Sequence, residues 1–328
     1  MTKRHQSNDI PAAVWPGQDL LNGKPVRSLT IIFRTIGCYW TGCTMCGFYN
    51  ESAITPPTQN DLLSQLEYAI GRMGDQTNLF KIFTSGSFFD NREISLSTRN
   101  LILERIASTG TIKKIVAETR PEFINKDTLS SALEILEKYN VKLEIAMGLE
   151  TSNDVIRDEC INKGFIFTDF IKASGIASEI GVSTKAYLLL KPPLLSEKTA
   201  INDMLASIID TTPYSSTISL NLCNVQRATT VERLFNKKDY RPPWLWSAVF
   251  ILSQAKQMFP EVTFMSDPVG AGAKRGPHNC RKCDKIVAQS LRDFSITQDR
   301  SILSSVDCDC YYLWEKVIEL EDFVYVPY

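Results

Sequence analysis

Six short apolar segments alternate with helix-like segments along the first 230 residues, and this alternation is the strongest limit on the possible fold. The apolar segments are residues 29–33, 79–84, 113–118, 141–147, 183–190 and 216–222. Apolar residues at helical spacing fill the intervals, at 60–73, 97–108, 127–138, 153–160, 170–180 and 200–209, with Asp127 as N-cap of the third helix. Strands that alternate with helices form βαβ units around a parallel sheet. We therefore predict an α/β fold of the partial (β/α)6 TIM-barrel type.

The length of the protein favours one large domain with a small appendage, because 328 residues can bury a full core. Residues 1–28 are polar and rich in turn-forming residues, and we expect them to be a lead-in that lies over the barrel. The barrel would then span residues 29–230. Residues 231–328 would form a helical and metal-binding extension, with a helix at 244–258 and a last strand at 261–265.

Three cysteines with the spacing C-x4-C-x2-C, namely Cys38, Cys43 and Cys46, follow the first predicted strand directly. Three thiolates on one loop can hold three irons of a [4Fe–4S] cluster, and the next cysteine, Cys160, is far away in the sequence. The fourth iron would then lack a protein ligand and could chelate the amino and carboxylate groups of S-adenosylmethionine (SAM). The pattern therefore predicts a cluster that binds SAM.

A zinc knuckle with Cys43 and Cys46 as half of the site is the simpler alternative. The third cysteine, placed directly after a strand, favours iron and sulfur instead. The order of strand, cysteine loop and long βα series is that of radical-SAM enzymes. Their usual first gap has three residues, so the four residues between Cys38 and Cys43 make this a variant loop.

Polar residues follow five of the predicted strands at the point where each strand ends. They include Ser85 to Ser87, Glu118 with Arg120, Glu150, Lys191, and Asn224 with Gln226. In such barrels, the chemistry lies at the carboxyl ends of the strands. One such residue could be an ordinary loop residue, but their recurrence predicts a site at this end of the sheet.

Two cysteine pairs, Cys280 with Cys283 and Cys308 with Cys310, stand in the extension with a helix-sized spacer between them. This arrangement predicts one site with four thiolates, most simply a structural zinc site. The C-x-C pair is tight for chelation, so His278 is an alternate ligand. An auxiliary iron–sulfur cluster is the second reading. A metal would stabilise a tail that has little core of its own.

Several functions are disfavoured by composition. The net charge is −1, so no overall field attracts nucleic acid, and RNA binding would depend on local basic patches or on a partner. Nine cysteines without a signal peptide indicate a reducing compartment, for which we expect the cytoplasm. No apolar segment is long enough to span a membrane. With only His5 and His278 present, a mechanism centred on a histidine base is not expected.

The sequence resembles the radical-SAM subunit of archaeal archaeosine synthase, known as RaSEA, along nearly its whole length. The resemblance is carried by TIIFRTIGCYWTGCTMCGFY (30–49), ETRPEFI (118–124), GLETSNDVIRDECINKGF (148–165), LLKPP (189–193), NVQR (224–227), PHNCRKCD (277–284) and CDCYYLW (308–314). More distantly, the sequence is similar to the radical-SAM domain of the Elongator catalytic subunit, which shares an ETRP stretch. The present sequence has no room for the acetyltransferase domain of that enzyme.

The resemblance implies a lyase that acts on tRNA. In the family, a partner subunit attaches lysine to a nitrile-bearing 7-deazaguanine in the tRNA D-arm. The radical-SAM subunit then breaks the C–N bond of the lysine side chain and leaves the amidine of archaeosine. Such an enzyme needs a [4Fe–4S] cluster, SAM and an electron donor that reduces the cluster. Hydrogen must be taken from carbon, which no side-chain base can do and the 5′-deoxyadenosyl radical can.

The resemblance and the motif positions together indicate site residues, although none is identified as catalytic. Ser85 and Gly86 stand where radical-SAM enzymes have a glycine-rich turn that meets the SAM amino group, here without its usual acidic residue. The expected cofactor contacts are Ser85, Gly86, Glu118, Glu150, Arg157, Lys163 and Lys191. The expected substrate contacts are Asn224, Gln226, Arg227, Arg241 and Trp244, of which the last two could stack on RNA.

Two other functions remain open from sequence. One is a different radical-SAM tRNA modification of the Elongator type, and the other is a zinc-stabilised RNA-binding protein without redox activity. Basic pairs such as Lys237-Lys238 and Lys274-Arg275 are scattered, and most would be solvated. We therefore expect the protein to bind tRNA weakly alone and to depend on the lysine-transferring subunit for affinity.

Overall fold

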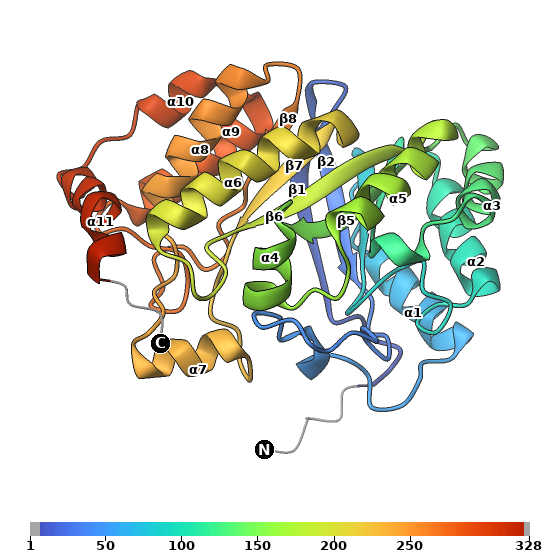
Figure 1. The fold of residues 1–328 in the computed structure, drawn as a ribbon. Coiled ribbons are helices and arrows are strands. Elements are labelled where there is room, and N and C mark those ends of the chain that lie inside the picture. The colour runs from blue at the N-terminus through green and yellow to red at the C-terminus, as the bar shows by residue number, and fades with distance from the viewer. Residues whose placement is uncertain (1–6, 325–328) are drawn as a thin grey trace. The chain divides into compact units, whose positions relative to one another are not determined.

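The computed structural model describes residues 7–324 and forms an α/β fold (Figure 1). Its sheet has eight strands, which are ordered β1 to β8 as in the sequence. The protein divides into two compact units. Residues 1–41, 48–148 and 168–185 form the first unit, and residues 42–47, 149–167 and 186–328 form the second.

The first unit holds the N-terminal strands and the helices that pack beside them (Figure 1). The strands are β1 (Ala13–Leu21), β2 (Lys24–Ile32), β3 (Thr77–Phe83), β4 (Lys114–Thr119) and most of β5 (Lys142–Glu150). The helices are α1 (Gln59–Ile70), α2 (Leu96–Ala107), α3 (Lys126–Glu137) and α5 (Phe167–Glu179), with short 3₁₀ turns at Phe48–Asn50 and Pro121–Phe123. From β2 to β5, neighbouring strands pair in parallel. The prediction of parallel βα units is confirmed here.

Strand β1 is the main feature that the sequence analysis missed. It consists of residues that were expected to belong to the lead-in, and it pairs antiparallel with β2 in a hairpin. Asn22 and Gly23 form the turn with φ of 53° and 72°, which is the left-handed backbone that a two-residue hairpin requires. Pro16 is accommodated because β1 lies at the sheet edge.

Local sequence signals explain where the first-unit helices begin. Thr58 caps α1 in a capping box with Asp61, whose side chain accepts from the Thr58 backbone. The cap of α3 is Asn125, whose side chain accepts from Thr128 N, so the prediction of Asp127 as N-cap was wrong by two residues. Both residue types suit the position, and the asparagine comes first in the sequence.

The second unit combines the later strands with the C-terminal helices (Figure 1). Its elements are α4 (Asp154–Ile156), the π-helical turn η3 (Arg157–Ile161), β6 (Ser183–Leu190), α6 (Glu197–Thr211), the 3₁₀ turn η4 (Thr212–Tyr214), β7 (Thr217–Leu222), α7 (Thr230–Lys237), α8 (Leu245–Met258), β8 (Thr263–Met265), α9 (Asp284–Thr297), α10 (Arg300–Ser304) and α11 (Cys310–Val324). Strands β7 and β8 pair in parallel.

The core of the second unit lies between α6, α8, α9 and β8, where Trp246, Leu252, Phe264 and Phe294 are buried. The predictions of a helix at 244–258 and a strand at 261–265 are confirmed by α8 and β8. Helix α7 was not predicted, because its eight residues are too few to show a clear helical repeat of apolar side chains.

Among residues 7–324, no helix combines the length and the apolar character needed to cross a bilayer.

Candidate functional site

The cysteine loop is divided between the two units. Cys38 belongs to the first unit, whereas Cys43 and Cys46 belong to the second. Only four residues separate Cys38 from Cys43, so the backbone itself keeps the three thiols within one short loop.

In the first unit, the loop after β2 lies directly against the loop after β3. Cys38 N donates to Ser85 O at 3.1 Å. A Cβ on Gly86 would lie 2.6 Å from Cys38 Cα and 2.8 Å from Cys38 N, closer than real Cβ atoms approach backbone. Glycine at position 86 is therefore what allows the two loops to meet backbone to backbone.

A buried carboxyl group, Glu93, joins the same two loops. Its Oε1 accepts from Ser87 N at 2.6 Å, and its Oε2 accepts from Thr35 Oγ1 at 2.5 Å. Glu93 is 5% exposed, and burial raises the pKa of its carboxyl from 4.5 to about 7, against the hydrogen bonds that lower it. Glu93 thus positions Thr35, which precedes Cys38, and Ser87, which follows Ser85.

Replacing Gly86 with alanine should displace Cys38, because the added methyl group would meet the Cys38 backbone and the Glu93 carboxyl. We expect about 1–3 kcal/mol of destabilisation and less iron per molecule after anaerobic reconstitution. Gly175→Ala is the matched control, since nothing lies within 4 Å of its Cβ position. Equal unfolding free energies and equal iron contents for the two variants would contradict the close approach.

Replacing Glu93 with glutamine should remove a dependence of stability on pH. The folded protein raises the pKa of Glu93 from 4.5 to about 7, so folding favours the protonated acid. Its contribution is complete below pH 4.5 and is lost as pH rises through about 7, by up to about 3 kcal/mol. Urea unfolding at pH 5 and pH 8 should show the variant gaining stability relative to the original protein as pH rises. Parallel pH curves for the two proteins would refute this.

The side chain of Ser85 fits a ligand at this loop. Ser85 is 5% exposed, yet its Oγ has no hydrogen-bond partner among the described residues. A buried hydroxyl without a partner is costly, and an incoming polar group would satisfy it. The residues present at this loop therefore fit the polar end of a small cofactor such as SAM.

The predicted residues after β4 form a polar and aromatic group in the same unit as Cys38. Arg120 Nε donates to Glu122 Oε1 at 2.6 Å, and Tyr39 Oη donates to the same oxygen at 2.6 Å. Arg120 N also donates to Ser87 Oγ at 3.0 Å. Glu118, at the end of β4, accepts from Phe88 N through its carbonyl. Glu118 and Arg120 therefore lie in the unit that holds Ser85 and Gly86.

In the second unit, residues 42–47 of the cysteine loop are held by η3. Thr44 N donates to Ile161 O at 2.9 Å, and Thr44 Oγ1 donates to Cys160 O at 2.6 Å. Asn162 Nδ2 donates to Gly42 O at 2.9 Å. Asn162 ends η3 with a left-handed φ of 55°, and its side chain reaches back to the loop.

Residues after β7 hold the same segment from another direction. Gly47 N donates to Gln226 Oε1 at 2.6 Å, and Val231 N in α7 donates to Thr44 O at 3.2 Å. A Cβ on Gly47 would lie 3.0 Å from Arg227 O. Gln226, which was expected to contact substrate, thus fixes the backbone next to Cys46.

Three of the expected cofactor contacts lie within hydrogen-bonding networks around β5. Lys163 Nζ and Glu150 Oε1 form an ion pair at 2.6 Å, and Glu150 adopts a positive φ of 67°. Arg157 is 1% exposed and bonds to Asp154 and to the carbonyls of Leu149 and Thr151. Burial lowers the pKa of Arg157, although the Asp154 charge opposes this.

Lys191 follows β6 and is buried in an ionic network. Its Nζ lies 2.8 Å from Glu197 Oε2 and 3.5 Å from Glu321 Oε1. Glu197 is fully buried, and its other oxygen accepts from Trp244 N and Ser247 Oγ. Lys191 has a φ of 56°, a strained backbone of the kind found at functional sites.

The remaining expected substrate contacts differ in exposure. Arg227 is exposed and Asn224 is half-buried. Trp244 is 8% exposed, with the Arg241 guanidinium 4.2 Å from its ring centre. Arg241 Nη2 also donates to His278 O at 2.7 Å. Arg241 and Trp244 therefore pack together inside the second unit, and their contact with RNA stays a prediction.

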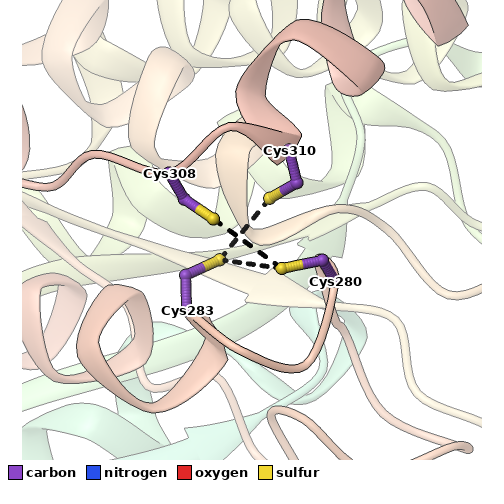
Figure 2. Close-up of side chains that lie close together, drawn as sticks. All are labelled: Cys280, Cys283, Cys308 and Cys310. Atoms are coloured by element: carbon purple, nitrogen blue, oxygen red, sulfur yellow. Dashed lines mark hydrogen bonds between the residues drawn. The ribbon is translucent and has the colours of Figure 1, made fainter.

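Four cysteines of the extension meet in one place (Figure 2). Cys280 and Cys283 come from the loop before α9, Cys308 lies in the loop before α11, and Cys310 is the first residue of α11. Their sulfurs lie within 4.8 Å of one another. The sulfurs of the pairs Cys280–Cys283 and Cys280–Cys308 are 3.8 Å apart, and those of Cys283–Cys310 are 3.6 Å apart. The prediction that these four cysteines come together is confirmed.

These three sulfur separations match those expected around a single tetrahedral ion. Four sulfurs at about 2.3 Å from one zinc ion would lie about 3.8 Å from one another. A [4Fe–4S] cluster with one thiolate on each iron needs wider separations between the thiolate sulfurs. Two N–H groups point at the sulfurs, from Trp246 Nε1 to Cys310 at 3.2 Å and from Asn279 Nδ2 to Cys283 at 3.5 Å. Such outer hydrogen bonds orient metal ligands.

His278, the alternate ligand expected from sequence, is not one of the four grouped residues. Its Nδ1 lies 2.8 Å from Gly276 O. The sulfurs complete a four-ligand set without it.

The two remaining cysteines, Cys160 and Cys223, are buried. Burial raises the pKa of Cys160 to about 11 and that of Cys223 to about 12. Both are therefore neutral thiols at pH 7, which suits core residues rather than metal ligands.

Comparison with known proteins supplies a second line of information. No protein-family model matches the sequence. The protein is 50% identical over 320 residues to a protein named archaeosine synthase subunit beta from Methanosarcina acetivorans, a match that spans 96% of the present sequence and 92% of that protein. It is 41% identical over 312 residues to the protein of the same name from Thermococcus kodakarensis, a match that spans 93% and 96%.

Among solved structures, the protein resembles Elp3 of the archaeon Methanocaldococcus infernus, with a TM-score of 0.53 and 16% identity. The match spans 71% of the present protein and 59% of that structure. This likeness concerns the fold alone. With the eight strands and the four-cysteine group, it confirms the predicted α/β class, a partial barrel with four grouped cysteines in its C-terminal extension.

Proposed function

Because the protein belongs to the archaeosine synthase beta-subunit family, we propose that it is a radical-SAM enzyme that completes archaeosine in tRNA. The observation that carries this proposal is identity of 50% and 41% to two such subunits across nearly the whole sequence. The reaction would break the C–N bond in the side chain of a lysine that is attached to 7-deazaguanine in the D-arm. The tRNA product would carry the amidine of archaeosine.

Cys38, Cys43 and Cys46 would hold the [4Fe–4S] cluster. Their loop offers three thiols, and no other cysteine of the protein is left for a fourth ligand: four form the second group, and burial keeps Cys160 and Cys223 neutral by raising the pKa of each. When bound, the cluster and SAM supply a carbon radical that can take hydrogen from an unactivated carbon.

The protein itself would hold the cluster loop and SAM in a fixed geometry. Gln226 and Thr44 fix the backbone around Cys43 and Cys46, while Glu93 and Gly86 fix the approach of Ser85 to Cys38. Ser85 Oγ would receive a polar group of SAM. Holding reactants in one geometry is what makes such a step efficient.

The word subunit in the relatives' names supports a partner, for which we propose the lysine-transferring subunit. An external electron donor would reduce the cluster. We propose zinc as the ion of the four-cysteine group, with a structural role.

One assay series tests the function. After anaerobic purification, we expect a brown protein with about four irons per molecule in its cysteine-loop cluster. Incubation with SAM and dithionite should release 5′-deoxyadenosine. With lysine-bearing tRNA, nucleoside mass spectrometry should then detect archaeosine.

The other outcomes identify the alternatives. A colourless protein that contains only zinc would point to an RNA-binding protein without redox activity. Release of 5′-deoxyadenosine with unchanged lysine-bearing tRNA would point to another radical-SAM modification of tRNA.

A further inference from the structure

Helix α7 presents a basic surface toward solvent. Its residue Val231 belongs to a buried group with Leu189, Cys223, Val225 and Tyr240, and its side chains Leu234 and Phe235 pack against that group. Because residues three and four apart share a helix face, Arg233 and Lys237 lie together on the opposite face. Both Arg233 and Lys237 are exposed.

Further cations border this face. We define the basic face as Arg233, Lys237, Lys238 and Lys274. Lys274 is placed beside α7 by its neighbour Arg275, which donates to Val225 O at 3.0 Å and to Glu232 Oε1 at 2.7 Å.

The cations of the basic face have no acidic partners of their own. Among residues 7–322, none of the four forms a salt bridge. Glu232 is occupied by Arg275 and by Ala228 N, which leaves Asp239 as the exposed acid next to Lys238. A protein with a net charge of −1 thus gathers positive charge on α7 and on the two lysines beside it, Lys238 and Lys274.

The basic face begins next to the cysteine loop. Val231 N, at the start of α7, donates to Thr44 O, the residue between Cys43 and Met45. Gln226, just before α7, accepts from Gly47 N. A polyanion on the basic face would therefore be held beside the residues that follow Cys43.

The side chains on the basic face argue for a nucleic acid rather than a membrane. Around Arg233, Lys237 and Lys238, no exposed large apolar side chain lies between residues 215 and 257 of the described part, whereas the loop that carries Lys274 has one, Val269. A membrane surface or an apolar protein interface would need such side chains. Lysine and arginine without apolar neighbours are typical of contacts to phosphates.

We propose that the basic face of α7 binds the phosphate backbone of the RNA substrate and holds that RNA beside the cysteine loop. This inference rests on the proposed function, which makes tRNA the substrate. It names the surface that would carry the sequence-independent part of RNA binding.

The test is the affinity of the full-length protein for a labelled tRNA transcript, measured by fluorescence anisotropy at about 50 and about 200 mM salt. Each phosphate contact contributes about fivefold in affinity near physiological salt. The double variant Arg233→Gln, Lys237→Gln should therefore bind about 10- to 30-fold more weakly, with the log–log salt slope smaller by about 1.5 to 2.

The matched control is Lys126→Gln, Lys138→Gln, which removes two exposed lysines at the ends of α3. Its affinity should stay within about twofold of the original protein's. Melting temperature and iron content of both variants should be unchanged, because none of the four side chains is buried.

Equal affinities for the α7 and control variants would overturn the inference, as would tRNA binding that is absent or insensitive to salt. Loss of partner-subunit binding by the α7 variant, with tRNA binding intact, would assign the surface to a protein. Failure of the proposed radical function is seen separately, as absence of 5′-deoxyadenosine in the reaction without RNA.

Discussion

Replacing Cys43 with serine should abolish the iron cluster and, with it, the release of 5′-deoxyadenosine from SAM. Serine keeps the size of the side chain but does not supply the thiolate that iron–sulfur clusters require. The iron content of anaerobically reconstituted protein should fall from about four atoms per molecule to below about one. The broad visible absorption band should disappear in parallel.

Cys160→Ala provides the control for this experiment, because Cys160 is also a cysteine close to the loop in the fold. Its contact with Thr44 is made through the backbone carbonyl, which the substitution retains. Burial raises the pKa of its thiol to about 11, so we expect no loss of iron in this variant. A Cys43→Ser protein with full iron content would remove the basis of the proposed function.

Replacing Cys283 with serine should remove zinc from the extension and destabilise the second unit. In small zinc domains, metal binding contributes about 10–16 kcal/mol to folding, so loss of one of four ligands should cost several kcal/mol. Helix α11 begins at Cys310, so we expect its amide hydrogens to exchange faster without the ion. Metal analysis by mass spectrometry, with hydrogen exchange, measures both effects.

His278→Gln is the control variant for the zinc site. The four sulfurs form a complete set without His278, so this variant should keep one zinc ion per molecule. Zinc lost from His278→Gln but kept in Cys283→Ser would show that the ligand set is different. If iron and acid-labile sulfide were found in the extension, the four-cysteine group would hold an iron–sulfur cluster and not zinc.

The parts of the fold that follow from periodicity could be predicted from sequence. The six predicted strands correspond to β2 to β7, because continuous apolar runs mark buried parallel strands. Strand β1 was missed because Pro16 and Gly17 lie within it, and both residue types are uncommon inside strands. The Asn22-Gly23 turn was the available signal, since this pair favours a two-residue hairpin.

The site could be predicted only where residue type decides the chemistry. The four cysteines of the extension come together as their spacing indicated. Gln226 shows the limit of sequence-based prediction. Its place after a strand predicts that it lies near the site, but not that its side chain accepts a hydrogen bond from Gly47 N. Glu93 was missed for the same reason: no spacing rule marks a carboxyl group that is buried by loops from distant segments.

Arg157 illustrates a further limit. A regular helix at 153–160 would leave a charged residue at this position free to reach a cofactor. Instead, η3 is a π-helical turn, and Arg157 is buried against carbonyl groups of residues 149 and 151. Sequence patterns do not mark such turns, which shift the following side chains around the helix.

The network around Lys191 has a consequence for how the protein is made. Glu197 N donates to Glu321 Oε2 across 124 residues, and Glu321 also pairs with Lys191. These contacts cannot exist on a ribosome-bound polypeptide until α11 has left the exit tunnel. The end of β6 should therefore acquire its native structure late, after the earlier strands have folded. A nascent polypeptide stalled before α11 would be exposed to proteases at that point.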